Sequence, residues 1–349
     1  MSSKASGQRR STPQKRGTSC WRCLIIVALL AGIGIGIWYA LGHPKPKNIK
    51  IPNLGDLTNV LGNLTDFIQG FNNDPFLSNN STSAWDNGNS NNGLSLTLYN
   101  ALDPKWYPYF IKAVNQWDNG TPDTLTLSTQ NVSVDHTCSR VNGILKVCNG
   151  NFGDTGWLGI NELITTTATN IILSSVAKMN EYYLANANEA QKQYTMCHEM
   201  GHGFGLPHTD ENFYNPDLGN CLDYTIHPEV NMQPAAMNFN RLKTLYGVVP
   251  ASSSGNRDLE TFVSNVHIPG RLTEVEEAEY QAAIDELEFD IVPNRGLMKI
   301  HDGASSEDGK PGWRLLQAHP HGHSSRYTRR LGHDFVLQVI VMHPVDHDM

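Results

Sequence analysis

The segment from Cys197 to Asp210 constrains the fold of this chain more than any other part of its sequence. It reads Cys-His-Glu-Met-Gly-His-Gly-Phe-Gly-Leu-Pro-His-Thr-Asp and continues a stretch from Glu189 that favours a helix. Two histidines four residues apart project from the same side of a helix, about one turn apart. Gly205 then lets the chain turn sharply out of the helix and brings His208 back toward them. The spacing therefore predicts a helix, a tight turn and three converging imidazoles.

Three neutral imidazoles in this arrangement are typical ligands of a zinc ion. His198, His202 and His208 are predicted to hold Zn²⁺ at about 2.0–2.1 Å and to leave one tetrahedral position open for water, whose pKa falls toward about 7. Glu199 is offset around the helix, so it is expected to take a proton from this water as it attacks a carbonyl and to pass the proton to the leaving amine. Asp210 is a rival third ligand, although His208 fits the spacing better.

The run from His198 to His208 matches H-E-x-x-H-x-x-G-x-x-H and so resembles the signature of the metzincin clan of zinc endopeptidases. The resemblance covers residues 94–250, less than half of the chain. It implies an α/β (α+β) zincin-like catalytic domain with a twisted, mostly parallel sheet, an active-site helix and a cleft between two subdomains. It also implies hydrolysis of protein or peptide substrates, with Glu199 as general base. The clan binds extended substrates along an edge strand, and Ile171–Val176, extending toward Lys178, is expected to take that role.

The chain departs from the clan where a methionine is expected beneath the zinc, in the Met-turn. Astacin-like and serralysin-like members carry Met-x-Tyr, and Leu222-Asp223-Tyr224 has that spacing with Leu222 at the methionine position. The two side chains have similar volumes, so the change is expected to cost less than about 1.5 kcal/mol. Tyr224 becomes a candidate oxyanion stabiliser, with an ordinary packing role as the alternative. Met232 and Met237 are rivals for the Met-turn position.

The variant Met-turn leaves a second function open. A catalytically inactive, metzincin-like binding or adhesion ectodomain would keep the zinc ligands without turnover. The intact Glu199 favours the enzyme, because a binding module has no need of a general base.

Charge is divided unevenly along the chain. Residues 1–50 contain nine Lys and Arg and no acidic residue, whereas the remaining 299 residues contain 17 bases and 34 acids and sum to −17. The acidic part argues against a nucleic-acid partner, since such proteins need a basic face. Leu24–Leu41 is an 18-residue stretch without a charge, long enough to cross a bilayer as a helix. The surrounding bases predict a cytosolic tail at residues 1–23 and a transmembrane signal anchor at residues 24–41.

A retained anchor makes the chain a single-pass type II membrane protein whose catalytic part is extracellular or in an endomembrane lumen. The alternative is a signal peptide cleaved near Ala40-Leu41-Gly42, which releases a secreted protein. Export is also favoured by five N-x-Ser/Thr glycosylation sequons, which begin at Asn63, Asn79, Asn80, Asn119 and Asn131.

Four cysteines on the exported side are expected to form disulfides in an oxidising compartment. Their closest pairing is Cys138–Cys148 and Cys197–Cys221, with two other pairings possible. The second bridge would join the active-site helix to the turn that carries Leu222.

Composition and periodicity divide the exported part into three. Residues 44–93 are rich in Asn and Ser and are predicted to form a glycosylated stalk. Residues 94–250 contain the periodic patterns of the catalytic domain, with strands at 94–99, 125–128, 156–161 and 170–176 and helices at 106–117, 189–204 and 231–246. Residues 251–349 are predicted to be a separate C-terminal region of unknown role. It would contain an acidic helix at 273–289, a strand at 335–341 and a surface loop at His319–His323.

Overall fold

The computed structural model of the chain describes residues 82–88, 90–251, 264–286, 312–318 and 324–344. The predicted tail and signal anchor, the sequons at Asn63, Asn79 and Asn80, and the loop 319–323 lie outside these residues. Among the helices that the structure describes, none has both the length and the hydropathy needed to cross a bilayer.

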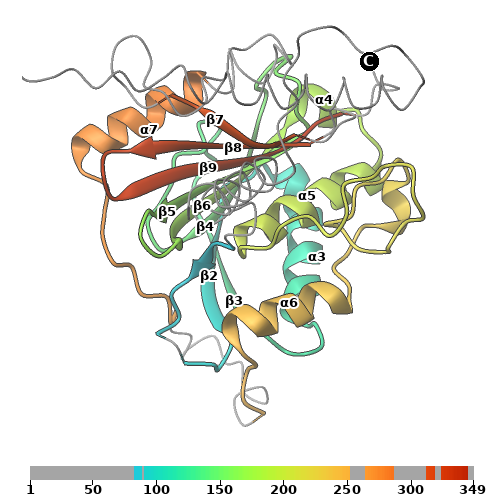
Figure 1. The fold of residues 1–349 in the computed structure, drawn as a ribbon. Helices are drawn as coiled ribbons and strands as arrows, with labels where there is room; N and C mark the ends of the chain where they lie inside the picture. Colours follow the sequence, from blue (N-terminus) through green and yellow to red (C-terminus); the bar gives the residue numbers. More distant parts are fainter. Residues whose placement is uncertain (1–81, 89, 252–263, 287–311, 319–323, 345–349) are drawn as a thin grey trace, which may run out of the picture. The chain divides into compact units, whose positions relative to one another are not determined.

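A mixed sheet forms the centre of the described fold (Figure 1). Its strand order is β3-β2-β4-β6-β5-β9-β8-β7, and β1 also pairs with β6. Pairings among β1, β2, β3, β4 and β6 are parallel, whereas those that involve β5, β7, β8 and β9 are antiparallel. The strands span Ala84–Trp85 (β1), Leu94–Asn100 (β2), Leu125–Asn131 (β3), Leu145–Gly150 (β4), Gly159–Thr166 (β5), Ile171–Asn180 (β6), Arg314–Ala318 (β7), Ser324–Leu331 (β8) and Phe335–Met342 (β9). The expected combination of helices and a sheet is confirmed, but the sheet is mixed rather than mostly parallel, because the parallel strands lie on one side of it and the antiparallel strands on the other.

Burial along the strands follows from their position in the sheet. β2 alternates between buried and half-buried residues, the period-two pattern that identified it in the sequence. β9 and β4 are buried along their whole length, as expected of strands covered on both faces. The residues of β4 do not alternate between apolar and polar, and Lys146 interrupts its apolar residues. For this reason β4 was not predicted from the sequence.

Helices cover both faces of the sheet. On one face lie α3 (Tyr107–Asp118), α5 (Glu189–Gly203) and α6 (Ala236–Tyr246), whose buried residues share one core cluster. On the other face lies α7 (Glu274–Glu286), which packs in a second cluster with Ile160 and Ile164 of β5. Leu163, between them, belongs to the first cluster because successive strand residues face opposite sides. The short helices are η1 (Pro104–Trp106), α4 (Glu181–Leu184) and η2 (Pro228–Val230).

The C-terminal strands extend the same sheet, so the expectation of a separate C-terminal region is wrong. β9 pairs antiparallel with β5 along its length, from Gly159 opposite Met342 to Thr166 opposite Phe335. Burying the apolar strand β9 between β5 and β8 removes more apolar surface from water than a peripheral position would.

Two further expectations need correction. The strand at Ile171–Val176 is not a sheet edge, because β6 pairs with β1 and β4 on one side and with β5 on the other. The last residues of the expected stalk belong to the fold. Trp85 is 2% exposed, and its indole nitrogen donates to the carbonyl of Gly203 at 2.9 Å, at the end of α5.

Candidate metal centre

The helix α5 carries the central residues of the site. It begins after Asn188, whose side chain accepts a hydrogen bond from the backbone N–H of Gln191 at 2.7 Å. All residues from 193 to 203 are buried. The helix ends at Gly203, and the chain turns away at Gly205, where φ is +88° and an added Cβ would collide with the carbonyl oxygen of Ser83. Glycine is therefore required at the turn, as the sequence predicted.

The structure brings the three predicted histidine ligands together. Nε2 of His202 lies 2.9 Å from Nε2 of His198 and 3.0 Å from Nε2 of His208, and the third distance is 3.2 Å. His198 and His202 are fully buried, whereas the side chain of His208 is 8% exposed. The cluster is thus accessible from the side of His208.

Hydrogen bonds at Nδ1 orient each imidazole. Nδ1 of His198 lies 2.7 Å from the carbonyl oxygen of Cys221, and Nδ1 of His202 lies 2.8 Å from that of Leu206. A carbonyl oxygen only accepts, so both Nδ1 atoms carry the proton and both Nε2 atoms keep a free lone pair. Burial, with the charge of the neighbouring imidazoles, lowers the pKa of both histidines well below the usual value. Both rings are therefore neutral, the form that binds metals.

These nitrogens fit a single metal ion. Two ligands at about 2.0–2.1 Å from a tetrahedral ion lie about 3.3 Å apart, close to the 2.9–3.2 Å separations found here. Three lone pairs at such distances repel one another unless a cation lies between them. His198, His202 and His208 can therefore hold a metal ion. The rival ligand Asp210 is not part of this group, and its carboxylate accepts a hydrogen bond from the backbone of Asn212 at 2.6 Å.

Glu199, the residue after the first histidine of the cluster, carries a buried carboxylate. It is fully buried, and neither carboxylate oxygen has a hydrogen-bond partner among the described residues. Burial raises the pKa of Glu199 well above its usual value. Its side chain reaches toward β5, where a Cβ added to Gly159 would lie 2.6 Å from Oε1. An unpaired buried carboxylate is costly to the fold, so Glu199 is a candidate functional residue.

The segment after the third histidine folds back beneath the cluster. The backbone N–H of Tyr224 donates to the carbonyl of Asp210 at 3.1 Å, and the hydroxyl of Tyr224 lies 3.1 Å from Nε2 of His208. Leu222 is fully buried, and a Cβ added to Gly201 of α5 would lie 2.9 Å from its Cδ2. The rival Met237 is 44% exposed. Leu222 therefore packs against α5, whereas the side chain of Met237 does not share this buried position.

Both expected disulfides are confirmed. Cys138–Cys148 joins β4 to the loop before it, and Cys197–Cys221 joins α5 to the returning segment. The second bridge lies next to His198 and includes the residue whose carbonyl oxygen orients that ring. The predicted sequon residues Asn119 and Asn131 are both exposed.

Two residues that support the site were not predicted. Glu211 accepts a hydrogen bond from Nδ1 of His208 at 2.8 Å and so orients the third imidazole. Its place three residues after a predicted ligand is a signal that could have identified it. Asn161 of β5 donates to the backbone oxygen of Glu199 at 2.8 Å. No local pattern marks Asn161, because it is 38 residues distant from Glu199 in the chain.

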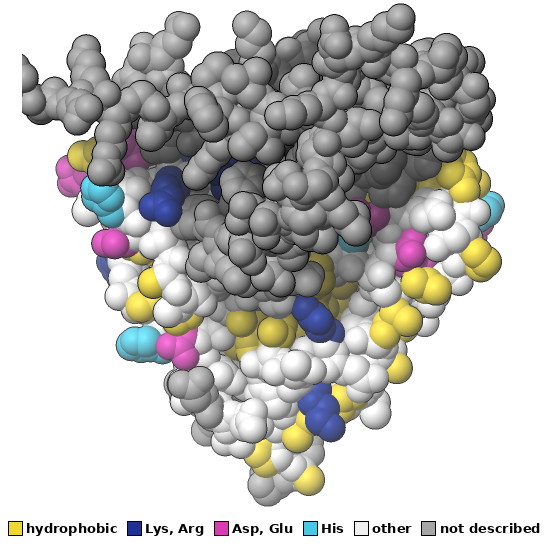
Figure 2. All heavy atoms as spheres, in the orientation of Figure 1, with side chains coloured by type: hydrophobic (Ala, Val, Ile, Leu, Met, Phe, Trp, Pro, Cys, Tyr) yellow, Lys and Arg dark blue, Asp and Glu magenta, His cyan; other side chains and the backbone are white. Residues whose placement is uncertain are grey.

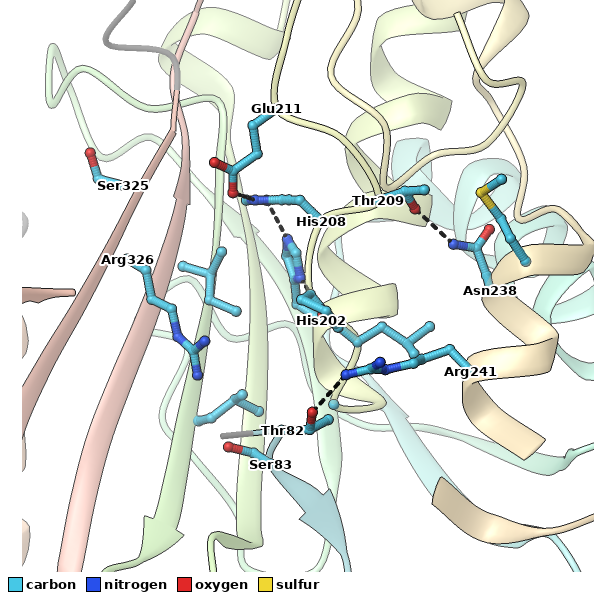
Figure 3. A pocket seen from close by; sticks show the side chains of 16 residues that line it. Thr82, Ser83, His202, His208, Thr209, Glu211, Asn238, Arg241, Ser325 and Arg326 are labelled. Atoms are coloured by element: carbon cyan, nitrogen blue, oxygen red, sulfur yellow. Dashed lines mark hydrogen bonds and ion pairs between the residues drawn. The ribbon is translucent and has the colours of Figure 1, made fainter. Parts of the chain in front are cut away.

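A cavity of about 410 Å³ opens beside the histidines (Figure 3). His202, His208 and Glu211 form one side of it, and Arg241 comes from α6. Arg326 belongs to β8, so the C-terminal strands, which were expected to form a separate region, complete the walls of this site. No protein-family model matches the chain, and no curated protein matches it significantly.

Proposed function

We propose that this chain is a zinc-dependent endopeptidase of the metzincin type. The observation that carries the proposal is the convergence of three imidazole nitrogens, two of them on a helix that also carries the unpartnered, buried carboxylate of Glu199. The parallel half of the sheet and the position of the three histidines on and after the helix α5 support the proposal. The pairing of β9 with β5 is a feature that the motif does not imply.

The donor set indicates what each residue contributes to hydrolysis. Zinc, when bound, polarises the carbonyl and lowers the pKa of water in the site toward about 7. Glu199, whose pKa burial raises, accepts a proton from the water as the water oxygen bonds to the carbonyl carbon. It then delivers that proton to the amine nitrogen as the C–N bond breaks. We assign the donor to the oxygen that becomes negative to the hydroxyl of Tyr224, because it lies 3.1 Å from Nε2 of the ligand His208.

The disulfides indicate an extracellular or lumenal location. We infer from residues 1–50 that the protein is held there as a type II membrane protein, with residues 24–41 as the anchor. Extraction of cell membranes with alkaline carbonate tests this point. An anchored chain stays in the pellet, and glycosidase treatment lowers its mass, whereas a secreted chain appears in the medium.

Peptide cleavage by the purified full chain tests the enzymatic function. A diverse peptide library is incubated with wild type, Glu199→Gln and Glu229→Gln, and bound zinc is measured in the same samples. Glu229 is an exposed carboxylate on η2, so its variant controls for the general effect of the substitution. Wild type and Glu229→Gln are expected to cleave, and a chelator is expected to stop both. Glu199→Gln is expected to lose about 10²–10⁴-fold in rate because it removes the general base.

The outcomes separate this proposal from a binding module. Cleavage that survives in Glu199→Gln contradicts the role given to this residue. Stoichiometric zinc without any cleavage by wild type contradicts the enzyme and supports the inactive, metzincin-like ectodomain. Absence of zinc at the site contradicts both.

A further inference from the structure

The cavity beside the histidines carries more positive than negative charge. Arg326 and Arg241 line it, and Glu211 is the single carboxylate among its described lining residues. Glu211 is already engaged by Nδ1 of His208 at 2.8 Å. Figure 3 shows the two arginines on opposite sides of the cavity. On the described part of the face in Figure 2, by contrast, Lys and Arg side chains stand singly among neutral and hydrophobic ones.

Neighbouring strands hold Arg326 in place. Its Nη2 donates to Oε1 of Gln338 on β9 at 2.5 Å. The amide nitrogen of Gln338 donates in turn to the hydroxyls of Ser83 and Thr165, each at 3.0 Å. These two bonds fix the orientation of the amide, so its oxygen faces the guanidinium. Arg326 is therefore positioned before any ligand arrives, which lowers the entropic cost of binding.

The guanidinium of Arg326 has unused hydrogen-bonding capacity. Its Nε is buried, and no described residue accepts a hydrogen bond from it. Gln338, its hydrogen-bond partner in the described part of the chain, is neutral. Burial lowers the pKa of Arg326, and the charge of Glu211 raises it in part, but an arginine stays protonated in a protein. A partly buried cation whose buried Nε lacks an acceptor is unfavourable until an anion reaches it.

Arg241 adds a second positive charge at the rim. It is exposed on α6, and its Nη2 donates to the hydroxyl of Thr82 at 2.8 Å. A planar guanidinium binds a carboxylate through two parallel hydrogen bonds, which makes carboxylates the anions best matched to this pair. The cavity volume of about 410 Å³ is ample for such a group.

We propose that this cavity binds a carboxylate of the peptide substrate and that Arg326 determines the resulting specificity. The inference rests on the proposed peptidase function and names the substrate class of the same site. The carboxylate belongs either to an Asp or Glu side chain near the cleaved bond or to the C-terminus of the peptide. Arg326 makes the direct contact, while Arg241 attracts the anion at the entrance.

Two matched pools of short, labelled peptides test the proposal on the full chain. The pools differ only in a central Asp or Asn, and each is made with a free and with an amidated C-terminus. Binding to chelator-treated protein is followed by fluorescence anisotropy, and cleavage by the zinc-loaded protein gives kcat/KM. Wild type is expected to prefer either Asp over Asn or the free over the amidated C-terminus. We expect that preference to be about 10- to 100-fold in both affinity and kcat/KM. The Asp and Asn arms report a side-chain carboxylate, and the free and amidated arms report a C-terminal one.

The variants assign the preference to its residue. Arg326→Gln is expected to reduce the carboxylate preference to less than about 3-fold. Arg326→Lys is expected to retain part of the preference, because lysine keeps the positive charge but cannot form the two parallel hydrogen bonds of a guanidinium. Arg330→Gln is the control, since Arg330 is an exposed arginine on the same strand that does not line the cavity. Thermal unfolding of each variant shows whether it folds. If Arg326→Gln does not fold, Arg241→Gln serves in its place and is expected to reduce the carboxylate preference by a smaller factor.

Failure of this inference is distinguishable from failure of the proposed function. Cleavage with no carboxylate preference in any arm, or a preference that Arg326→Gln and Arg326→Lys leave unchanged, overturns the inference and leaves the peptidase standing. A carboxylate preference in binding that Arg326→Gln removes supports the inference even when no peptide is cleaved.

Discussion

Breaking the Cys197–Cys221 disulfide is expected to weaken metal binding as well as the fold. The bridge ties α5 to the segment that returns beneath the histidines. Cys221 also supplies the carbonyl oxygen that orients His198 at 2.7 Å. The double variant Cys197→Ala/Cys221→Ala therefore loosens both a covalent constraint and the position of one orienting acceptor.

The chain-entropy model gives the size of the stability effect. A sequence separation of 24 between the bridged residues corresponds to about 3.4 kcal/mol of lost free energy of unfolding, and the separation of 10 in Cys138–Cys148 to about 2.7 kcal/mol. The two double variants are thus destabilised to a similar degree. Disturbing a group that orients a metal-binding histidine reduces metal affinity by about 10–100-fold, and only the first variant displaces such a group, the carbonyl oxygen of residue 221.

Two measurements separate these effects. Urea unfolding of the chelator-treated proteins gives the stability loss, and zinc competition with a chromophoric chelator gives the metal affinity of the folded variants. Cys138→Ala/Cys148→Ala is expected to bind zinc like wild type, whereas Cys197→Ala/Cys221→Ala binds it at least about 10-fold more weakly. Equal zinc affinities in the two variants would refute the coupling between this bridge and the site.

Three other substitutions test separate parts of the structure. Gly159→Ala places a Cβ 2.6 Å from Oε1 of Glu199, so the carboxylate must move. Peptide cleavage is therefore expected to fall about 10²-fold, while bound zinc stays stoichiometric. Unchanged cleavage contradicts this placement of the carboxylate. Burial alone would raise the pKa of Asp135, but hydrogen bonds from Lys146 and two hydroxyls hold it well below its usual 3.8. Because the pKa of Asp135 is lower in the folded than in the unfolded protein, its ionised carboxylate stabilises the fold above pH 3.8. In urea titrations, the free energy of unfolding of wild type should exceed that of Asp135→Asn at neutral pH, and this difference should shrink as the pH falls below 3.8. A difference that does not change with pH argues against the ion pair. Leu222→Met is expected to change the free energy of unfolding by less than about 1.5 kcal/mol and to preserve zinc binding, and loss of zinc would show that Leu222 is not equivalent to a Met-turn methionine.

The sequence alone predicted the parts of the site that depend on short separations. His198, His202 and His208 fall within one helix and the turn after it, so helix geometry and one glycine were enough to bring them together. Cys197 and Cys221 flank the same segment, and proximity along the chain selected the correct pairing. In each case the spacing of residues is itself the structural constraint.

Features that depend on long-range strand pairing escaped prediction. The apolar sequence of Phe335–Met342 predicts that this strand is buried, but it does not identify the strand with which it pairs. The expected separate C-terminal region followed from that ambiguity, and so did the expected edge strand at Ile171–Val176. Arg326 was missed for the same reason, because its role arises only when β8 is placed next to the histidines.

The pairing of β5 with β9 also sets an order for the folding of this chain. Gly159 of β5 pairs with Met342, 183 positions later, so β5 is synthesised long before the strand that covers it. Until then β5 presents unpaired backbone groups at a sheet edge, the kind of surface that recruits other chains. Closing so long a loop is also a slow step in forming a sheet. The part of the chain that carries the three histidines is therefore expected to need chaperones until its last strands have been synthesised.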